Sequence, residues 1–133
     1  MNTELDPADI LFSNFVREEA NWMCKLKFKC RGIISFKENK SDLHCCHYHS
    51  RKKRPVRFGR DNTDSGCWIC HDYYDKHMPK EEKEAWKKNQ IGVERFRALN
   101  VRANHINMGL KMRKEDELEY VKELIKESKK HAS

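Results

Sequence analysis

The sequence predicts an α+β fold, a small domain stapled by a metal ion and flanked by helices on its N- and C-terminal sides. A histidine- and cysteine-rich stretch runs from His44 to His71, and both ends of the chain carry amphipathic helical patterns. With 133 residues, of which 38% are apolar and 37% are charged, the chain can bury only a modest core, and such small domains often need a metal. We expect one domain over residues 1–110 and a charged C-terminal helix over 111–133.

Helices are predicted from apolar residues at helical spacing and from typical start and stop residues. Asp6-Pro7 is typical of a helix start, because a capping residue precedes proline at the first helical position. The predicted helices run from Pro7 to about Ala20, from Cys67 to near Lys76, from Pro79 onward, from Gly92 to Gly109, and from about Lys114 to Lys130.

Two stretches are predicted to be extended strands. Cys24–Cys30 alternates apolar side chains with lysines, which is the period of two that a strand shows. Leu43–Tyr48 is short and bounded by turn-prone residues. Ser50–Gly66 contains proline, glycine and Asp-Asn, so we expect a long ordered loop there, and loops of this length in a small domain are usually functional.

Positive charge is concentrated in the middle of the chain. The net charge is +7, but Trp22–Arg60 holds twelve Lys or Arg and two acids, a local balance of +10, so the rest sums to −3. Such unopposed charge favours a polyanion, and we expect DNA as the partner. The predicted phosphate contacts, which raise affinity without reading base sequence, are Arg51, Lys52, Lys53, Arg54, Arg57 and Arg60.

The N-terminal residues and the hydropathy argue against a secreted or membrane protein. The first residues show neither the basic nor the apolar region of a secretory signal. No apolar run approaches the ~20 residues that a membrane span requires. We therefore expect an intracellular protein with no membrane partner, and in a reducing compartment grouped Cys and His residues usually indicate a metal.

A structural zinc site is predicted from the cysteines. Cys67-x-x-Cys70 has the spacing at which two thiolates from one turn bind Zn²⁺, and two more ligands are needed. Cys24 and Cys30 are the best candidates, although their spacer is longer than that of a usual knuckle, and Cys45 or a histidine could substitute. Buried free thiols are the alternative interpretation.

A second, catalytic site is predicted from the order His, Asn, Cys-x-x-Cys-His, which is that of HNH nucleases. Phosphodiester hydrolysis needs a base to deprotonate water and a metal to neutralise charge on the phosphate. We expect His47 to be the base, Asn62 to hold the loop and His71 to bind Mg²⁺ or another divalent metal. Asp75 lies on the same helix face as His71 and could supply a second ligand. A turn role for Asn62, zinc ligation by His71 and a plain surface role for Asp75 are the alternatives.

An ordered set of short pieces over roughly residues 10–103 resembles a known family. The pieces are Phe12–Arg17, a cysteine after Trp22, Cys45–Tyr48, Arg51, Val56–Phe58, Asp61-Asn62, Cys67–His71 and Ile91–Leu99. Together they are similar to the phage recombination endonuclease family NinG (also called Rap) and related phage HNH proteins. The resemblance implies a zinc-stapled, treble-clef-like ββα-metal core that cleaves DNA, with branched recombination intermediates as a plausible substrate. It also implies the host cytoplasm as the location if the chain is phage-encoded.

The resemblance assigns roles to single residues. It carries the base role to His47, the loop asparagine to Asn62 and the helix histidine to His71. Arg51 and Arg57 would contact phosphates.

The chain departs from the family at two places. The family's first cysteine pair is usually Cys-x-x-Cys, whereas five residues separate Cys24 from Cys30. Many HNH enzymes have an acid or a histidine immediately before the base, and this chain has Cys46 there, although a thiolate is a poor ligand for magnesium. The open alternatives are a softer metal, weakened catalysis, or completion of the site by His44, His49 or Asp75.

The second function that the sequence allows is a non-catalytic, zinc-stabilised DNA-binding or adaptor module. Cys46 is the residue that favours it, because it stands where a ligand for a catalytic metal is expected. The oligomeric state stays open, and a dimer is one option.

Overall fold

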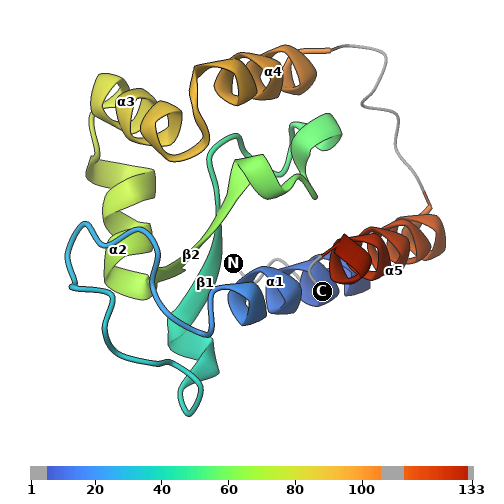
Figure 1. Cartoon of the computed structure of the whole chain (residues 1–133), viewed down its shortest axis with the longest axis horizontal. Helices are drawn as coiled ribbons and strands as arrows, with labels where there is room; N and C mark the ends of the chain where they lie inside the picture. The colour runs from blue at the N-terminus through green and yellow to red at the C-terminus, as the bar shows by residue number, and fades with distance from the viewer. Residues whose placement is uncertain (1–5, 106–112, 132–133) are drawn as a thin grey trace.

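A two-stranded antiparallel hairpin, formed by β1 (Leu43–His47) and β2 (Thr63–Cys67), lies between two groups of helices in the computed structural model (Figure 1). The structure describes residues 6–105 and 113–131. The helices are α1 (Pro7–Glu19), α2 (Trp68–Asp72) with its π-helical continuation η4 (Tyr73–His77), α3 (Lys80–Ile91), α4 (Val93–Ala103) and α5 (Lys114–His131). Short 3₁₀ turns are η1 (Lys40–Asp42), η2 (Arg54–Val56) and η3 (Arg60–Asn62). The expected α+β class is confirmed.

The helices cover the hairpin on two sides. α1 packs against both strands, and α5 lies along α1 although it comes last in the chain (Figure 1). α2 begins where β2 ends and packs back on the hairpin, while α3 and α4 pack on each other and α4 contacts η2 and η3. The hairpin therefore has a different helical neighbour on each face.

The register of the hairpin decides which residues meet. Leu43 pairs with Cys67 and His47 pairs with Thr63, so the start of β1 lies beside the end of β2. Because α2 starts directly after Cys67, its first turn lies next to the start of β1. Side chains near position 44 and near position 71 are thereby brought to one place.

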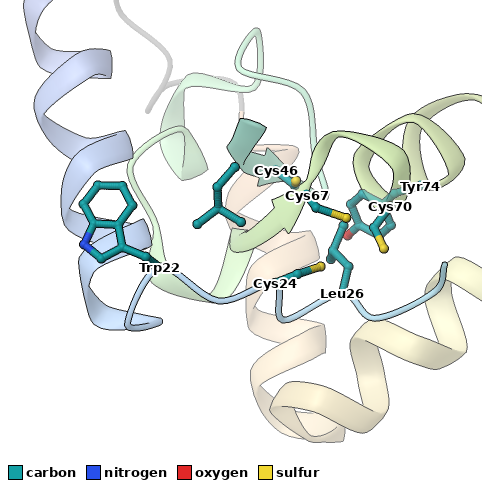
Figure 2. Packing of buried hydrophobic residues seen from close by; sticks show 8 residues of the cluster. Trp22, Cys24, Leu26, Cys46, Cys67, Cys70 and Tyr74 are labelled. Atoms are coloured by element: carbon teal, nitrogen blue, oxygen red, sulfur yellow. The ribbon is translucent and has the colours of Figure 1, made fainter. Parts of the chain in front are cut away.

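The buried residues of the described chain form three clusters. In one, side chains from α1 and α5 meet around Phe12, Phe58 and Val121, and a small one joins Val56 to Leu99 and Ala103 of α4. In the third, Trp22, Leu43 and Tyr74 pack with four cysteines: Cys24, Cys46, Cys67 and Cys70 (Figure 2). The cysteines thus account for much of the core near α2, as expected for a chain with few apolar residues.

Most helices predicted from the sequence are present. α1, α3 and α5 begin at or within one residue of the expected starts. The helix predicted from Gly92 to Gly109 is α4, which ends at Ala103, and Gly109 lies outside the described residues. The predicted strand Leu43–Tyr48 is β1.

Two secondary-structure predictions are wrong. Cys24–Cys30 is not a strand: the neighbouring Met23 forms an isolated bridge with Ser35, and Lys27 has a left-handed φ of 60°, which breaks an extended run. The second error is the end of the predicted loop Ser50–Gly66, because Thr63–Cys67 is strand β2. Asp64 and Gly66 within it have low strand propensity, and pairing with β1 and burial hold the segment extended.

Within the described parts of the chain, every helix falls short of the length or the apolar character that crossing a bilayer requires.

Candidate metal centre and histidine cleft

Four cysteines from two distant segments form a cluster, named here the cysteine cluster: Cys24, Cys30, Cys67 and Cys70. Their sulfur atoms all lie within 4.8 Å of one another, and the Sγ atoms of Cys30 and Cys70 are 3.7 Å apart. Figure 2 shows the sulfurs of Cys24, Cys67 and Cys70 directed into one region. Four thiolates around a tetrahedral Zn²⁺ with bonds of ~2.3 Å would stand about 3.8 Å apart. The cluster therefore fits a metal ion.

Backbone amides surround these sulfurs. The N–H of Lys29 donates to Cys70 Sγ at 3.2 Å. Other amides donate to the remaining three sulfurs, and they belong to Lys27, Gly32, Cys67 and Cys70. Such donors stabilise negative charge on sulfur, as the thiolate ligands of a metal require. Burial, together with the neighbouring thiols of Cys70 and Cys24, raises the pKa of the Cys67 thiol to about 11, so a cation is needed to hold this thiol deprotonated near neutral pH.

The long spacer between Cys24 and Cys30 closes because of its conformation. Lys27 takes a left-handed φ of 60°, and Gly32 takes a φ of 68° just after the second cysteine. Leu26, within the spacer, is buried against Gly66 of β2. A Cβ atom added to Gly66 would lie only 2.5 Å from Leu26 Cδ1. The spacer thus bends back on the hairpin and brings both thiols to one place, which the spacing alone did not reveal.

A second feature, named here the histidine cleft, opens between α1, β1, α2 with η4, and α3. It has a volume of about 660 Å³ and is lined by His44, His47, Arg51, His71, Asp75 and Lys83, among others. Burial lowers the pKa of Lys83, whose ammonium lies over the Tyr74 ring at 4.2 Å. The cleft therefore combines three imidazoles with cationic side chains.

Two of the three imidazoles face each other. The Nδ1 atoms of His44 and His71 are 2.8 Å apart, and Nε2 of His71 lies 2.9 Å from Oδ2 of Asp75. Burial and the neighbouring His71 lower the pKa of His44, which keeps this ring neutral, as a metal ligand must be. Asp75 contacts the other nitrogen of His71, where a carboxylate orients a metal-binding imidazole. The Asp75 carboxylate thus pairs with His71, and the hypothesis that it supplies a second metal ligand stays a prediction.

His47, the predicted base, lies in the same cleft on the opposite face of β1 from His44. Burial and then the charge of Arg51 lower its pKa to about 4. The imidazole is therefore neutral at pH 7 and has a nitrogen free to accept a proton. A hydrogen bond to the backbone of Arg57 holds the ring.

Asn62 fastens the end of β1. It is fully buried, its Oδ1 accepts from the N–H of His49, and its Nδ2 donates to the carbonyl of the same residue. Its own carbonyl accepts from the N–H of Tyr48. These three bonds fix the backbone directly after His47, so Asn62 holds the end of the strand that carries His47.

Cys46 does not enter the cleft. It is fully buried, and its Sγ lies 2.9 Å from where a Cβ on Gly66 would stand. Burial raises its pKa well above the ordinary value, so the thiol stays protonated.

Of the three residues left open to complete the site, His44 faces His71, whereas His49 bonds Asn100 through Nε2 at 2.8 Å. The sequence did not single out His44; the signal was the register, which sets the start of β1 beside α2.

Of the six predicted phosphate contacts, five are at least partly exposed and one, Arg57, is buried. Lys52 and Lys53 are exposed, Arg54 is half-buried, and Arg51 lines the cleft with a 3.6 Å ion pair to Asp9. Arg60 is partly exposed and pairs with Glu19 at 2.7 Å.

Arg57, which we expected to contact phosphate, is instead buried among carboxylates. Its side chain is 10% exposed, and it bonds Asp9, Glu117 at 2.9 Å and Asp6 at 3.3 Å. Because three carboxylates already occupy the guanidinium, Arg57 joins α1 to α5 inside the protein.

The two features differ in how many ligands they bring together. Among residues 6–105 and 113–131, the cysteine cluster is the single group in which three or more Cys, His, Asp or Glu ligand atoms lie together. The histidine cleft presents two facing nitrogens. Comparisons with protein-family models, with curated proteins and with solved structures found no match to this chain.

Proposed function

We propose that the protein is a metal-dependent DNA endonuclease of the HNH type that hydrolyses phosphodiester bonds at the histidine cleft. The observation that carries the proposal is the convergence of His44, His47 and His71 on one cleft at the edge of a basic loop. Two imidazoles that face each other suit a divalent metal, and the nearby imidazole of His47, which burial keeps neutral, suits a general base. DNA is the proposed partner, inside the cell.

Each group in the cleft has a role in this proposal. His44 and His71 would hold the divalent metal, and Asp75 would orient His71 through its Nε2. When bound, such a metal supplies positive charge opposite the phosphate and the leaving oxygen. His47 accepts the proton of the attacking water at its ring nitrogen, and Asn62 keeps the β1 end in place.

The surrounding cations would position the phosphate backbone. Arg51 lies within the cleft, and Lys52 and Lys53 are exposed immediately beyond it. Their contacts raise affinity without selecting a base sequence, so binding is expected to weaken steeply with salt. Lys83 adds a cation on the α3 side of the cleft.

The cysteine cluster is proposed to hold a structural Zn²⁺, separate from the metal of the cleft. All four donors are sulfur atoms, which suits Zn²⁺ and does not suit Mg²⁺. The ion would join the segment after α1 to the start of α2, and so fix the position of His71 relative to β1.

A second candidate function is a zinc-stabilised DNA-binding module without catalysis. It is favoured by the difference in ligand number, because the cleft offers two facing nitrogens where the cysteine cluster offers four sulfurs. In that case the cations would bind DNA, and the histidines would only line the surface.

A metal-titrated cleavage assay tests the proposal. The purified protein is incubated with linear duplex, single-stranded, supercoiled and four-way-junction DNA in Mg²⁺, Mn²⁺ or Ni²⁺. We expect nicks or cuts in at least one of these DNAs. Binding to every DNA with no cutting in any metal would overturn the nuclease and leave the zinc-stabilised DNA-binding module.

A further inference from the structure

The loop between α1 and β1 presents two adjacent isoleucines to solvent. Ile33 and Ile34 are 71% and 69% exposed, the highest exposures among the large apolar side chains of the described residues. Figure 1 shows this segment as the long blue-to-cyan loop that leaves α1 and returns to β1. Contiguous exposed apolar surface on a protein is a feature of contact sites, which makes this pair a candidate for one.

Backbone contacts at the base of the loop fix the position of Ile33 and Ile34. Its base is closed by the N–H of Phe36, which donates to the carbonyl of Trp22 at 2.8 Å, and by the bridge between Met23 and Ser35. Gly32 precedes the pair with a φ of 68°, and a Cβ there would lie 2.8 Å from the Cys24 carbonyl. The tip is therefore a fixed turn rather than a frayed end.

The charge around the pair identifies the chemistry of a partner. Exposed cations surround it on both sides, with one acid, Glu38, in the same stretch: Lys25, Lys27, Lys29, Arg31, Lys37 and Lys40. Within residues 6–105 and 113–131, none of these six cations is in an ion pair with a carboxylate. A polyanion with an apolar interior is the complement of such a surface.

We propose that Ile33 and Ile34 form an apolar wedge that inserts between the bases of DNA while the neighbouring cations hold its phosphates. Isoleucine is one of the side chains that proteins insert at base steps, and insertion costs less where a step is already unstacked. The wedge should therefore favour DNA with a bulge over a continuous duplex. This inference rests on the proposed function in so far as DNA is the substrate.

The loop also leads to the histidine cleft. Its last turn, η1 (Lys40–Asp42), directly precedes β1, and Arg17 from the cleft donates to the Lys40 carbonyl at 2.9 Å. A base step held at Ile33 and Ile34 would belong to the same DNA whose backbone enters the cleft. The wedge would thus select where along a DNA the cleft acts.

Binding of a bulged and a continuous duplex, each carrying 2-aminopurine at the tested step, checks the wedge in buffer without added divalent metal. The test variant is Ile33→Ser with Ile34→Ser, and Val101→Ser on α4, where Val101 is 68% exposed, is the matched control. We expect the wild type to bind the bulged duplex about tenfold more tightly and to raise its fluorescence. The double variant should lose both effects and keep its zinc content and its affinity for the continuous duplex, while Val101→Ser should keep both effects.

Other outcomes overturn the wedge. Two of them concern the bulge: an unchanged preference in the double variant, or no preference in the wild type. The other two point to another partner: the double variant keeps its DNA binding but loses binding to phosphatidylserine vesicles, or it loses self-association in sedimentation.

The two proposals fail separately. A protein that prefers the bulge through these isoleucines but never cuts DNA contradicts only the nuclease. Continued cleavage with an unchanged preference in the double variant contradicts only the wedge.

Discussion

The Nδ1 atoms of His44 and His71 lie 2.8 Å apart, although the two histidines are 27 positions apart in the chain. The hairpin register and the start of α2 directly after Cys67 bring them together. One nitrogen must donate and the other accept, or both must face a metal ion. The pair is therefore the place where an exchangeable metal is expected.

Removing a histidine of this pair should remove the second metal. We expect wild-type protein to take up one exchangeable Mn²⁺ beside its zinc in a calorimetric titration, and His71→Ala to take up none. Asp75→Asn should weaken the site by about 10–100-fold, because it loses the group that orients His71. His49→Ala, which removes a ring bonded to Asn100, should bind Mn²⁺ normally. Equal Mn²⁺ affinity in His71→Ala and wild type would contradict this assignment.

The cysteine cluster should contribute metal-dependent stability. Cys70→Ser is expected to lose zinc and to lower the free energy of unfolding by at least about 3 kcal/mol, measured by urea denaturation with metal analysis. Cys45→Ser is the matched control, because Cys45 packs against the α1 and α5 side and lies outside the cluster. If Cys70→Ser kept one equivalent of zinc and wild-type stability, the cluster would not be the zinc site.

Arg57 should matter for folding rather than for DNA. Arg57→Ala leaves the Glu117 carboxylate buried without its partner and leaves Asp9 with only the longer ion pair to Arg51, so we expect a loss of about 3–5 kcal/mol in the free energy of unfolding. Lys52→Ala, at an exposed position, should change stability by less than about 0.5 kcal/mol while weakening DNA binding and its salt dependence. The opposite pattern, a stable Arg57→Ala that binds DNA poorly, would restore Arg57 as a phosphate contact.

His47 should make stability depend on pH. Its pKa falls from 6.5 in the unfolded chain to about 4 in the folded protein, so the unfolded state binds the proton first. The contribution is complete above pH 6.5 and is lost as the pH falls towards 4. Between pH 7 and pH 5 the wild type should lose about 1–2 kcal/mol more than His47→Gln, measured by urea denaturation at each pH. Acid weakens the cysteine cluster in both proteins, so the difference between their losses of unfolding free energy comes from His47. Equal losses in the two proteins would mean that the His47 ring is exposed to solvent.

Local patterns predicted the helices and β1 but failed where distant contacts decide. The alternation in Cys24–Cys30 suggested a strand, whereas Lys27 turns left-handed and neighbouring amides bond sulfurs instead of a strand. Thr63–Cys67 looked like a loop because Asp64-Ser65-Gly66 is typical of turns, and pairing with β1 overrides that preference.

The candidate site was predictable only in part, again because contacts between distant segments decide which side chains meet. His47, Asn62 and His71 stood out through their order in the chain, and the structure places His47 and His71 in one cleft, with Asn62 holding the chain after His47. His44 required the hairpin register, which no local pattern reveals. Arg57 could not be told from its basic neighbours, because its partner Glu117 lies 60 residues further along the chain.

The rate of DNA cleavage by His47→Ala tests the central claim most directly. Supercoiled DNA is incubated in Mn²⁺ with wild type, His47→Ala and His77→Ala, the last removing an exposed histidine that pairs with Asp72. Because only His47 is placed as the general base, its removal should slow cleavage by about 10²–10⁴-fold while zinc content, Mn²⁺ uptake and DNA affinity stay unchanged. His77→Ala should cut like the wild type. Cleavage by His47→Ala at the wild-type rate, or no cleavage by the wild type on any DNA, would contradict the account.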